Sequence, residues 1–196
     1  MSFVGRTGAE KRALVNLVMR FYEVDGGRIM LDGVDSAAMD REDLRRGIGM
    51  VRQDTWLCGG TIEDNIRYGR EGASREEVLE AARVTHVDRF VRTLPDGYET
   101  VIDEEGSNVS AGEKQLLTIA RAFLADQAIL ILDEATSSLD TRTEVLVQHA
   151  MAALRPARTS FVIAPRLPPI PAAVVFFVLK HGPLRAQGDQ GDRRPH

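Results

Sequence analysis

The chain has little cysteine and no long apolar run, and each shortage excludes a class of protein. A single cysteine, Cys58, cannot form an internal disulfide, which argues against a disulfide-stapled secreted domain and fits a reducing compartment. The longest apolar run, residues 172–179, is far shorter than the roughly 20 residues that a membrane-spanning helix needs. We therefore expect a buried strand there, and membrane association only through another chain.

The sequence also lacks an excess of positive charge and a secretory leader. Its 196 residues carry a formal net charge of −4, which gives no reason to expect nucleic acid or an anionic membrane surface as a partner. Charged residues such as Arg6, Glu10 and Lys11 stand where a leader needs an apolar stretch. The 4 histidines show no metal-ligand spacing. With 43% hydrophobic residues, one globular domain is expected.

Residues 108–144 combine helix, strand and turn signals in one short stretch. Ser110 and Glu113 have the spacing of a capping box, which satisfies backbone N–H groups at a helix start. Residues 128–132 form a continuous apolar run, typical of a central parallel strand. Asp133 and Glu134 follow at its carboxyl end, where open α/β sheets bind ligands.

This stretch resembles the ATPase domain of ATP-binding cassette (ABC) transporters. Residues 109–113 match the signature motif, and residues 129–133 match the Walker B strand. Glu134 matches the catalytic glutamate, and residues 137–140 match the D-loop. The order and spacing of these motifs are specific to the family.

The resemblance runs from Gly5 to about residue 188 and implies an α/β fold. Its core is that of a P-loop NTPase (RecA-like), with a mostly parallel sheet and a helical subdomain inserted at about residues 72–124. We expect residues 1–188 to form the nucleotide-binding domain and residues 189–196 a disordered tail.

The phosphate-binding loop of this fold reads G-x-x-x-x-G-K-[ST]: backbone N–H groups and the lysine hold phosphates, and the hydroxyl binds Mg²⁺. Gly5, Gly8 and Lys11 are in place. Glu10 replaces the last glycine, and Arg12 replaces the hydroxyl residue. We interpret this segment as a degenerate Walker A motif.

Both replacements are expected to weaken nucleotide binding. A carboxylate about 4 Å from a phosphate repels it by roughly 4 kcal/mol at an effective dielectric near 20. Without screening by salt, the repulsion between Glu10 and phosphate lowers the affinity for nucleotide by roughly three orders of magnitude. Arg12 can offset part of this charge but cannot supply the oxygen ligand that Mg²⁺ requires.

Three further features refine the resemblance. Gln53 resembles the Q-loop glutamine, and Trp56 with residues 60–66 matches the exporter branch. The histidine that senses the γ-phosphate in the family is replaced by Pro165, which offers no side-chain hydrogen bond. The short distance from Gln53 to Ser110 leaves no room for the coiled coil of the chromosome-maintenance relatives, so a nucleic-acid role is disfavoured.

The resemblance also predicts an incomplete antiparallel β-subdomain. In the family, strands that precede the phosphate loop pair with the strand expected at residues 28–32 and supply an aromatic residue that stacks on adenine. Four residues precede Gly5 here, so we expect an N-terminally truncated domain. Hydrophobic spacing predicts the other elements: a helix at residues 13–22, strands at 48–51 and 159–164, helices after Ser74, and a closing hairpin at 174–187.

The resemblance implies ATP and Mg²⁺ as cofactors and assigns the site residues by matching position. Glu134 polarises the attacking water, while Gln53 and Asp133 arrange Mg²⁺. Residues that contact nucleotide are Gly5, Gly8, Lys11, Ser110, Gly112 and Asp140. Ser110 and Gly112 act on the γ-phosphate held by an opposite subunit. The implied partners are a second ABC ATPase domain and a membrane-spanning transporter domain on another chain, at the cytoplasmic face of the cell membrane.

Three interpretations are open. The chain is a working ATPase subunit of an exporter, or a non-catalytic partner that lends its signature motif to another ATPase domain, or a decayed remnant. Asp133, Glu134 and Gln53 favour the first, and Glu10, Arg12 and Pro165 count against it. Autonomous hydrolysis is expected to be impaired, and the transported substrate is not predicted.

Overall fold

The computed structural model describes residues 2–5, 8–52, 55–103, 106–133, 141–154, 158–164, 176–179 and 184–188. The chain divides into two compact units. Unit 1 contains Met1–Met50, Ala128–Glu134 and Thr159–His196, and unit 2 contains Val51–Gln127 and Ala135–Arg158. Each unit is described by itself below.

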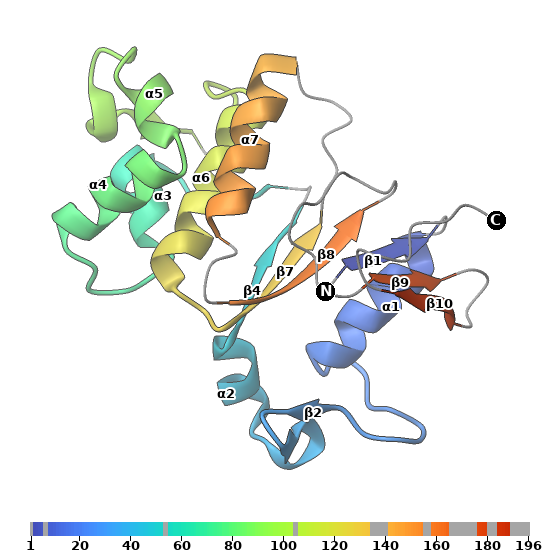
Figure 1. Cartoon of the computed structure of the whole chain (residues 1–196). Coiled ribbons are helices and arrows are strands. Elements are labelled where there is room, and N and C mark those ends of the chain that lie inside the picture. Colours follow the sequence, from blue (N-terminus) through green and yellow to red (C-terminus); the bar gives the residue numbers. More distant parts are fainter. Residues whose placement is uncertain are drawn as a thin grey trace. The chain divides into compact units, whose positions relative to one another are not determined.

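The main sheet belongs to unit 1, and Figure 1 shows its strands side by side. Among the described residues it has six strands in the order β10-β9-β1-β8-β7-β4. Their bounds are β1 Ser2–Gly5, β4 Ile48–Val51, β7 Ile129–Asp133, β8 Thr159–Ala164, β9 Phe176–Leu179 and β10 Leu184–Gly188. β1 pairs in parallel with both β8 and β9, and β7 pairs in parallel with β8. β10 pairs with β9 in the antiparallel direction.

The core of unit 1 lies where helix α1, Gly8–Val18, packs with helix α2, Arg41–Arg46, and strands β4 and β7. Buried apolar side chains from all four meet there: Val15, Val18, Met19, Leu44, Ile48 and Ile131. Asp40 caps α2 by accepting hydrogen bonds from the backbone N–H groups of Glu42 and Asp43. These contacts fix α1 and β7, which carry two of the expected motifs.

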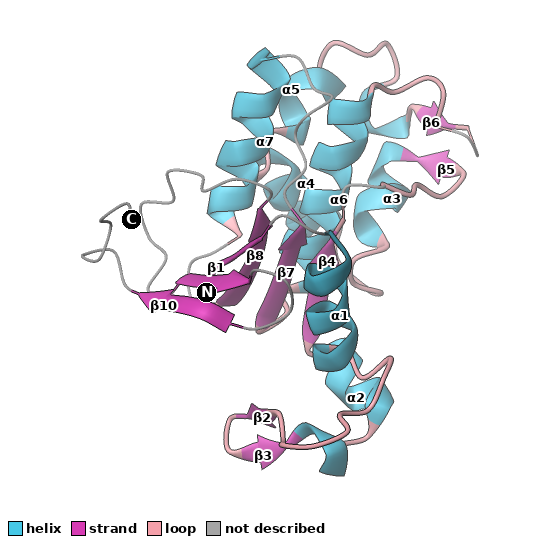
Figure 2. Ribbon diagram, turned by 90° about the vertical axis from the view of Figure 1, so that its right-hand side faces the viewer, coloured by secondary structure: helices cyan, strands magenta, loops and turns pink. Residues whose placement is uncertain are grey.

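A small hairpin separates α1 from α2. It pairs β2, Met30–Leu31, with β3, Val34–Asp35, and is followed by the short helix η1, Ser36–Ala38. Both turn residues have left-handed backbones, with φ of 47° at Asp32 and 82° at Gly33, as a two-residue hairpin turn requires. Figure 2 shows the hairpin as a ribbon separate from the main sheet.

Unit 2 is mainly helical, and α6, Ala111–Ala125, is its central element. Helix α6 contacts α3 (Ile62–Arg67), α4 (Arg75–Val84), α5 (Val87–Val91) and α7 (Thr141–Ala153). Its buried face includes Leu116, Leu117 and Ile119, as its helical spacing predicts. A two-stranded ribbon pairs β5, Gly60–Thr61, with β6, Val101–Ile102. The short helix η2, Gly97–Glu99, directly precedes β6, and α6 follows β6 in the chain.

The described elements confirm the predicted mixed α/β fold with a mostly parallel sheet. The strands expected at residues 48–51 and 159–164 have those bounds, and the closing hairpin is β9 with β10. The helix expected at residues 13–22 is shifted: it begins at Gly8 and ends at Val18, because Arg20 takes a left-handed backbone with φ of 51°. Among the described residues, no helix is both long enough and apolar enough to cross a bilayer.

Candidate functional site

The parallel strands of unit 1 bring two of the expected motifs to one edge of the sheet. β8 lies between β1 and β7, and its residues pair with both neighbours: Val4 is opposite Ala164, and Asp133 is opposite Ile163. The carboxyl ends of β1 and β7 therefore lie at the same edge, one strand apart. This edge is where open α/β sheets bind ligands.

The segment after β1 has the strand–loop–helix order of a phosphate site. Strand β1 ends at Gly5, and α1 begins at Gly8, so Lys11 lies in the first turn of the helix. The N-terminal turn of a helix presents unpaired backbone N–H groups and a positive dipole end, which favour phosphate. Gly5 therefore ends β1, and Gly8 and Lys11 lie in the first turn of α1, while phosphate binding by these residues stays a prediction.

Strand β4 lies beside β7 in the main sheet. The N–H of Ile129, at the start of β7, donates to the carbonyl of Gly47, which directly precedes β4. β4 and β7 therefore start at the same end of the sheet, and both run toward the site edge. Gln53 follows the last residue of β4 by two positions. Gln53, Glu134 and Asp140 lie outside the described residues, and of Asp133 the backbone alone is described.

The signature motif of unit 2 lies at the exposed start of α6. The N–H of Ser110 donates to Oε2 of Glu113 at 2.7 Å, and the N–H of Glu113 donates to Oγ of Ser110 at 3.3 Å. This confirms the predicted capping box. Ser110 and Ala111 are exposed, while Gly112 is buried against the unit. The hydroxyl of Ser110 accepts from the N–H of Glu113, and the residue lies exposed at the N-terminus of α6.

The loop that leads into α6 is held by its own side chains. The carboxylate of Asp103 accepts hydrogen bonds from the N–H of Ser107 at 2.7 Å and from its hydroxyl at 2.5 Å. The amide of Asn108 donates to the carbonyl of Val101 in β6 at 2.7 Å. Gly106 supplies a left-handed turn with φ of 63°. The start of the signature helix is thus fixed by local hydrogen bonds.

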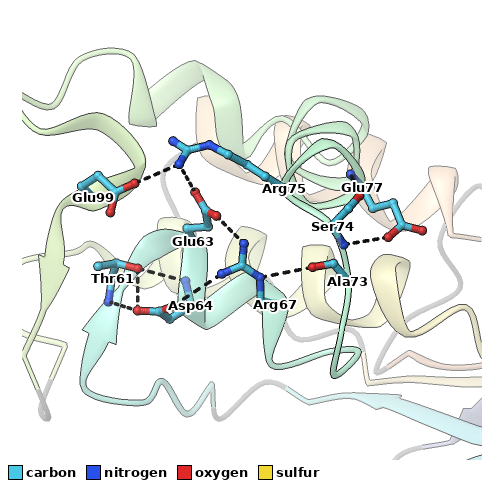
Figure 3. A network of polar contacts seen from close by, with 9 residues as sticks. All are labelled: Thr61, Glu63, Asp64, Arg67, Ala73, Ser74, Arg75, Glu77 and Glu99. Atoms are coloured by element: carbon cyan, nitrogen blue, oxygen red, sulfur yellow. Dashed lines mark hydrogen bonds and ion pairs between the residues drawn. The ribbon is translucent and has the colours of Figure 1, made fainter.

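Figure 3 shows a polar network that joins α3, the start of α4 and η2 in unit 2. Glu63 is 5% exposed, and its carboxylate pairs with Arg67 and, at 3.4 Å, with Arg75. Arg75 also pairs with Glu99 at 3.3 Å. Because Glu99 lies just before β6, the network ties the ribbon before the signature motif to α3 and α4. Buried carboxylates need such partners to offset lost hydration.

The same network predicts a pH dependence centred on Asp64. Hydrogen bonds from the Thr61 hydroxyl and N–H hold the pKa of this carboxyl below its usual value. A folded-state pKa below the unfolded one stabilises the protein above the unfolded pKa, and the gain is lost as pH falls through the folded pKa.

Asp64→Asn is therefore expected to lower the unfolding free energy by about 1 kcal/mol at pH 7, as for loss of a helix cap. Urea titrations should show this difference unchanged from pH 7.5 to 5.5 and shrinking below roughly pH 4, the usual Asp pKa. Thr61→Ala should remove the pH-dependent part that comes from the hydroxyl and keep the part that comes from the N–H of residue 61. If the unfolding free energies of the original chain and of Asp64→Asn differ by the same amount down to pH 3, the assignment to Asp64 is contradicted.

Sequence reasoning missed Arg121, a buried polar residue of α6. Its side chain donates to the carbonyls of Trp56 and Asn65. The signal was available: Arg121 interrupts an apolar face at helical spacing, four positions after Leu117 and three before Leu124. An arginine on a core-facing stripe indicates a specific partner, since an unpaired buried guanidinium is costly.

Comparisons with known proteins agree with the motifs. A family model described as "ABC transporter" matches residues 1–137. A fatty acid ABC transporter ATP-binding/permease protein of Mycobacterium bovis is 57% identical over 192 residues, which make up 98% of this chain and 30% of that protein. An ATP-dependent lipid A-core flippase of Syntrophus aciditrophicus is 47% identical over 188 residues, 96% of this chain and 31% of the flippase.

A solved structure gives the same result at the level of the fold. The structure of a bacterial Atm1-family ABC exporter with ATP bound superposes with a TM-score of 0.87 at 43% sequence identity. The match covers 97% of this chain and 33% of that exporter chain. The chain therefore spans about a third of the length of the relatives it matches.

Proposed function

The chain belongs to the ABC transporter family, and from that premise we propose that it is the ATP-binding part of an exporter. The family implies ATP binding, and in this role ATP binding and hydrolysis would drive transport across a membrane. Domains of this kind act in pairs, so we propose a second ABC ATPase domain and a membrane-spanning transporter domain as partners, at the cytoplasmic face of the membrane. Two relatives are named for fatty acid and lipid A-core, which favours a lipid-like cargo.

One observation carries this proposal: the register that places the ends of β1 and β7 at one sheet edge with a single strand between them. A phosphate held at the start of α1 and a cation held by the carboxylate after β7 would then be neighbours. We assign phosphate binding to Gly5, Gly8 and Lys11, and Mg²⁺ to Asp133 with Gln53. Mg²⁺ would neutralise charge on the transferred phosphoryl group.

The remaining roles follow the family pattern. We assign the polarisation of the attacking water to Glu134, assisted by Gln53. Ser110 and Gly112 at the start of α6, with Asp140, would contact nucleotide held by the opposite subunit. The exposed position of Ser110 at the N-terminus of α6 supports this assignment.

The residue types present at the phosphate loop fit ATP only in part. Glu10 adds a negative charge beside the phosphates, Arg12 provides no oxygen for Mg²⁺, and Pro165 stands where the family has a histidine. We therefore propose that the chain's own hydrolysis is impaired. The intact capping geometry at Ser110 favours a second role, in which this chain lends its signature face to a partner with a complete phosphate loop.

Two matched serine variants test this role. Ser110→Ala and Ser74→Ala each remove the hydroxyl of a capping box, at the start of α6 and of α4. Each is expected to lower the unfolding free energy by about 1 kcal/mol. Only Ser110→Ala should weaken MgATP-dependent association with a complete ABC ATPase domain, roughly tenfold, because a hydrogen bond to a charged group contributes about 1.5–3 kcal/mol.

The association is measured by sedimentation, with the isolated ATPase domain of the Mycobacterium bovis relative as the partner. Its catalytic glutamate is replaced by glutamine so that ATP stays bound. Equal effects of the two serine variants would contradict the role of the signature face. Absence of any MgATP-dependent association would contradict the proposed function itself.

A further inference from the structure

Arg121 is the most deeply buried guanidinium for which the structure describes the surroundings. Its residue is 8% exposed, and it lies in the third turn of α6. Nε donates to the carbonyl of Asn65 at 2.5 Å, Nη1 donates to the carbonyl of Trp56 at 2.7 Å, and Nη2 donates to Oδ1 of Asn65. The guanidinium also lies 5.4 Å from the ring centroid of Tyr68.

No carboxylate pairs with this arginine in the described part of the chain. Its charge is offset by carbonyl oxygens and by the faces of two aromatic rings, those of Tyr68 and Trp56. Burial lowers the pKa of the Arg121 guanidinium, because a charged group loses hydration there. An apolar side chain of similar volume would avoid that cost. Arg121 therefore fixes the positions of the carbonyls that accept its hydrogen bonds, which an apolar side chain cannot do.

Asn65 extends the contact to the next residues of the same segment. Its amide donates to the carbonyls of Cys58 and Thr61, each at 2.9 Å, and its Oδ1 accepts from the N–H of Cys58 at 3.0 Å. Asn65 is fully buried. Arg121, Asn65 and the backbone of Trp56 and Cys58 form one hydrogen-bonded group, which we name the arginine clasp.

The arginine clasp joins two parts of the proposed site along the chain. Trp56 follows Gln53 by three positions, and Arg121 lies on the helix that begins after Ser110. The planar fork of arginine fixes two backbone carbonyls in one geometry, whereas the donors of a lysine ammonium rotate on a flexible stem. The segment that leads out of the Gln53 motif is thus held to the signature helix by one side chain.

We propose that Arg121 is a positioning residue, which holds residues 56–65, the segment that follows Gln53 in the sequence, against the signature helix and so affects Mg²⁺-dependent nucleotide binding. This inference rests on the proposed function, because it assigns Gln53 a role at Mg²⁺. Arg121 acts through the carbonyls of Trp56 and Asn65 and touches no reacting group.

Cys58 provides a direct probe of the clasp, because it is the single cysteine of the chain and is partly buried. Arg121→Lys keeps the charge and loses the fork, and Arg121→Met removes the charge with little change of volume. Both are expected to speed modification of Cys58 by a thiol reagent at least about tenfold without denaturant, since about 1.4 kcal/mol of lost hydrogen bonding raises local opening by that factor.

Leu117→Ala is the matched control. Leu117 is fully buried in the same helix and is not part of the clasp, and its truncation should lower global stability by leaving a cavity. Suppose that Leu117→Ala and the Arg121 variants lose the same stability and speed thiol modification equally. Arg121 is then merely structural, and the proposal is overturned.

A second readout separates positioning from stability. ATP binding is measured by equilibrium dialysis with Mg²⁺ and with EDTA, and the ratio of the two dissociation constants gives the Mg²⁺-dependent gain. This ratio of dissociation constants should fall toward one in Arg121→Lys and keep its original value in Leu117→Ala. An unchanged gain in Arg121→Lys contradicts the proposal. If no form of the chain binds ATP, the proposed function fails, and the thiol experiment alone decides whether the clasp exists.

Discussion

Gly69→Ala is expected to destabilise the chain by about 3 kcal/mol or more, a cost at the upper end for forcing atoms into a packed core. A Cβ at this position would lie 2.2 Å from the carbonyl oxygen of Arg121 and 2.9 Å from its carbonyl carbon and Cα. These are backbone atoms of α6, which cannot rotate away as a side chain can. The end of α3 and helix α6 would have to separate, and the packing of Ile66 and Leu117 would loosen with them.

Urea denaturation followed by circular dichroism measures this cost, with two glycines as controls. Gly26→Ala has open space at its Cβ and should change the unfolding free energy by less than about 0.5 kcal/mol. Gly72→Ala meets no atom within 4 Å but has a left-handed backbone with φ of 78°, so a cost of about 1 kcal/mol is expected. A loss at Gly69 no larger than that at Gly72 would show that α3 and α6 can separate freely.

Restoring the phosphate loop is expected to have the largest effect on function. The triple variant is Glu10→Gly, Arg12→Thr, Pro165→His. Loss of the Glu10 carboxylate relieves about 4 kcal/mol of repulsion with phosphate and should raise the affinity for ATP by up to roughly three orders of magnitude. The threonine hydroxyl supplies the missing oxygen for Mg²⁺. We expect measurable turnover in the variant and little in the original chain.

The measurement is ATP binding and phosphate release by both purified chains with Mg²⁺, beside the triple variant carrying Glu134→Gln. The last change should abolish turnover and leave binding, if Glu134 polarises the water as proposed. Hydrolysis by the unmodified chain at the rate of the triple variant would contradict the impaired phosphate loop. Binding without turnover in the triple variant would place the defect elsewhere in the site.

The sequence by itself determined the local features, because their signals lie within a few residues of each other. The predicted capping box of Ser110 with Glu113 is confirmed by both of its hydrogen bonds. The strand predicted at residues 129–133 from the Walker B match is β7, with the same bounds. The motif order also determined the family, which the comparisons confirm.

Only the tertiary structure decided which distant residues meet. The pairing of β1 with both β8 and β9 joins residues near the two ends of the described chain, and no local pattern specifies that order. The hydrogen bond from Arg121 to Trp56 spans 65 positions, and the close approach of Gly69 to Arg121 arises between two packed helices. Such contacts depend on how apolar faces fit in three dimensions, and hydrophobic periodicity identifies the faces without naming their partners.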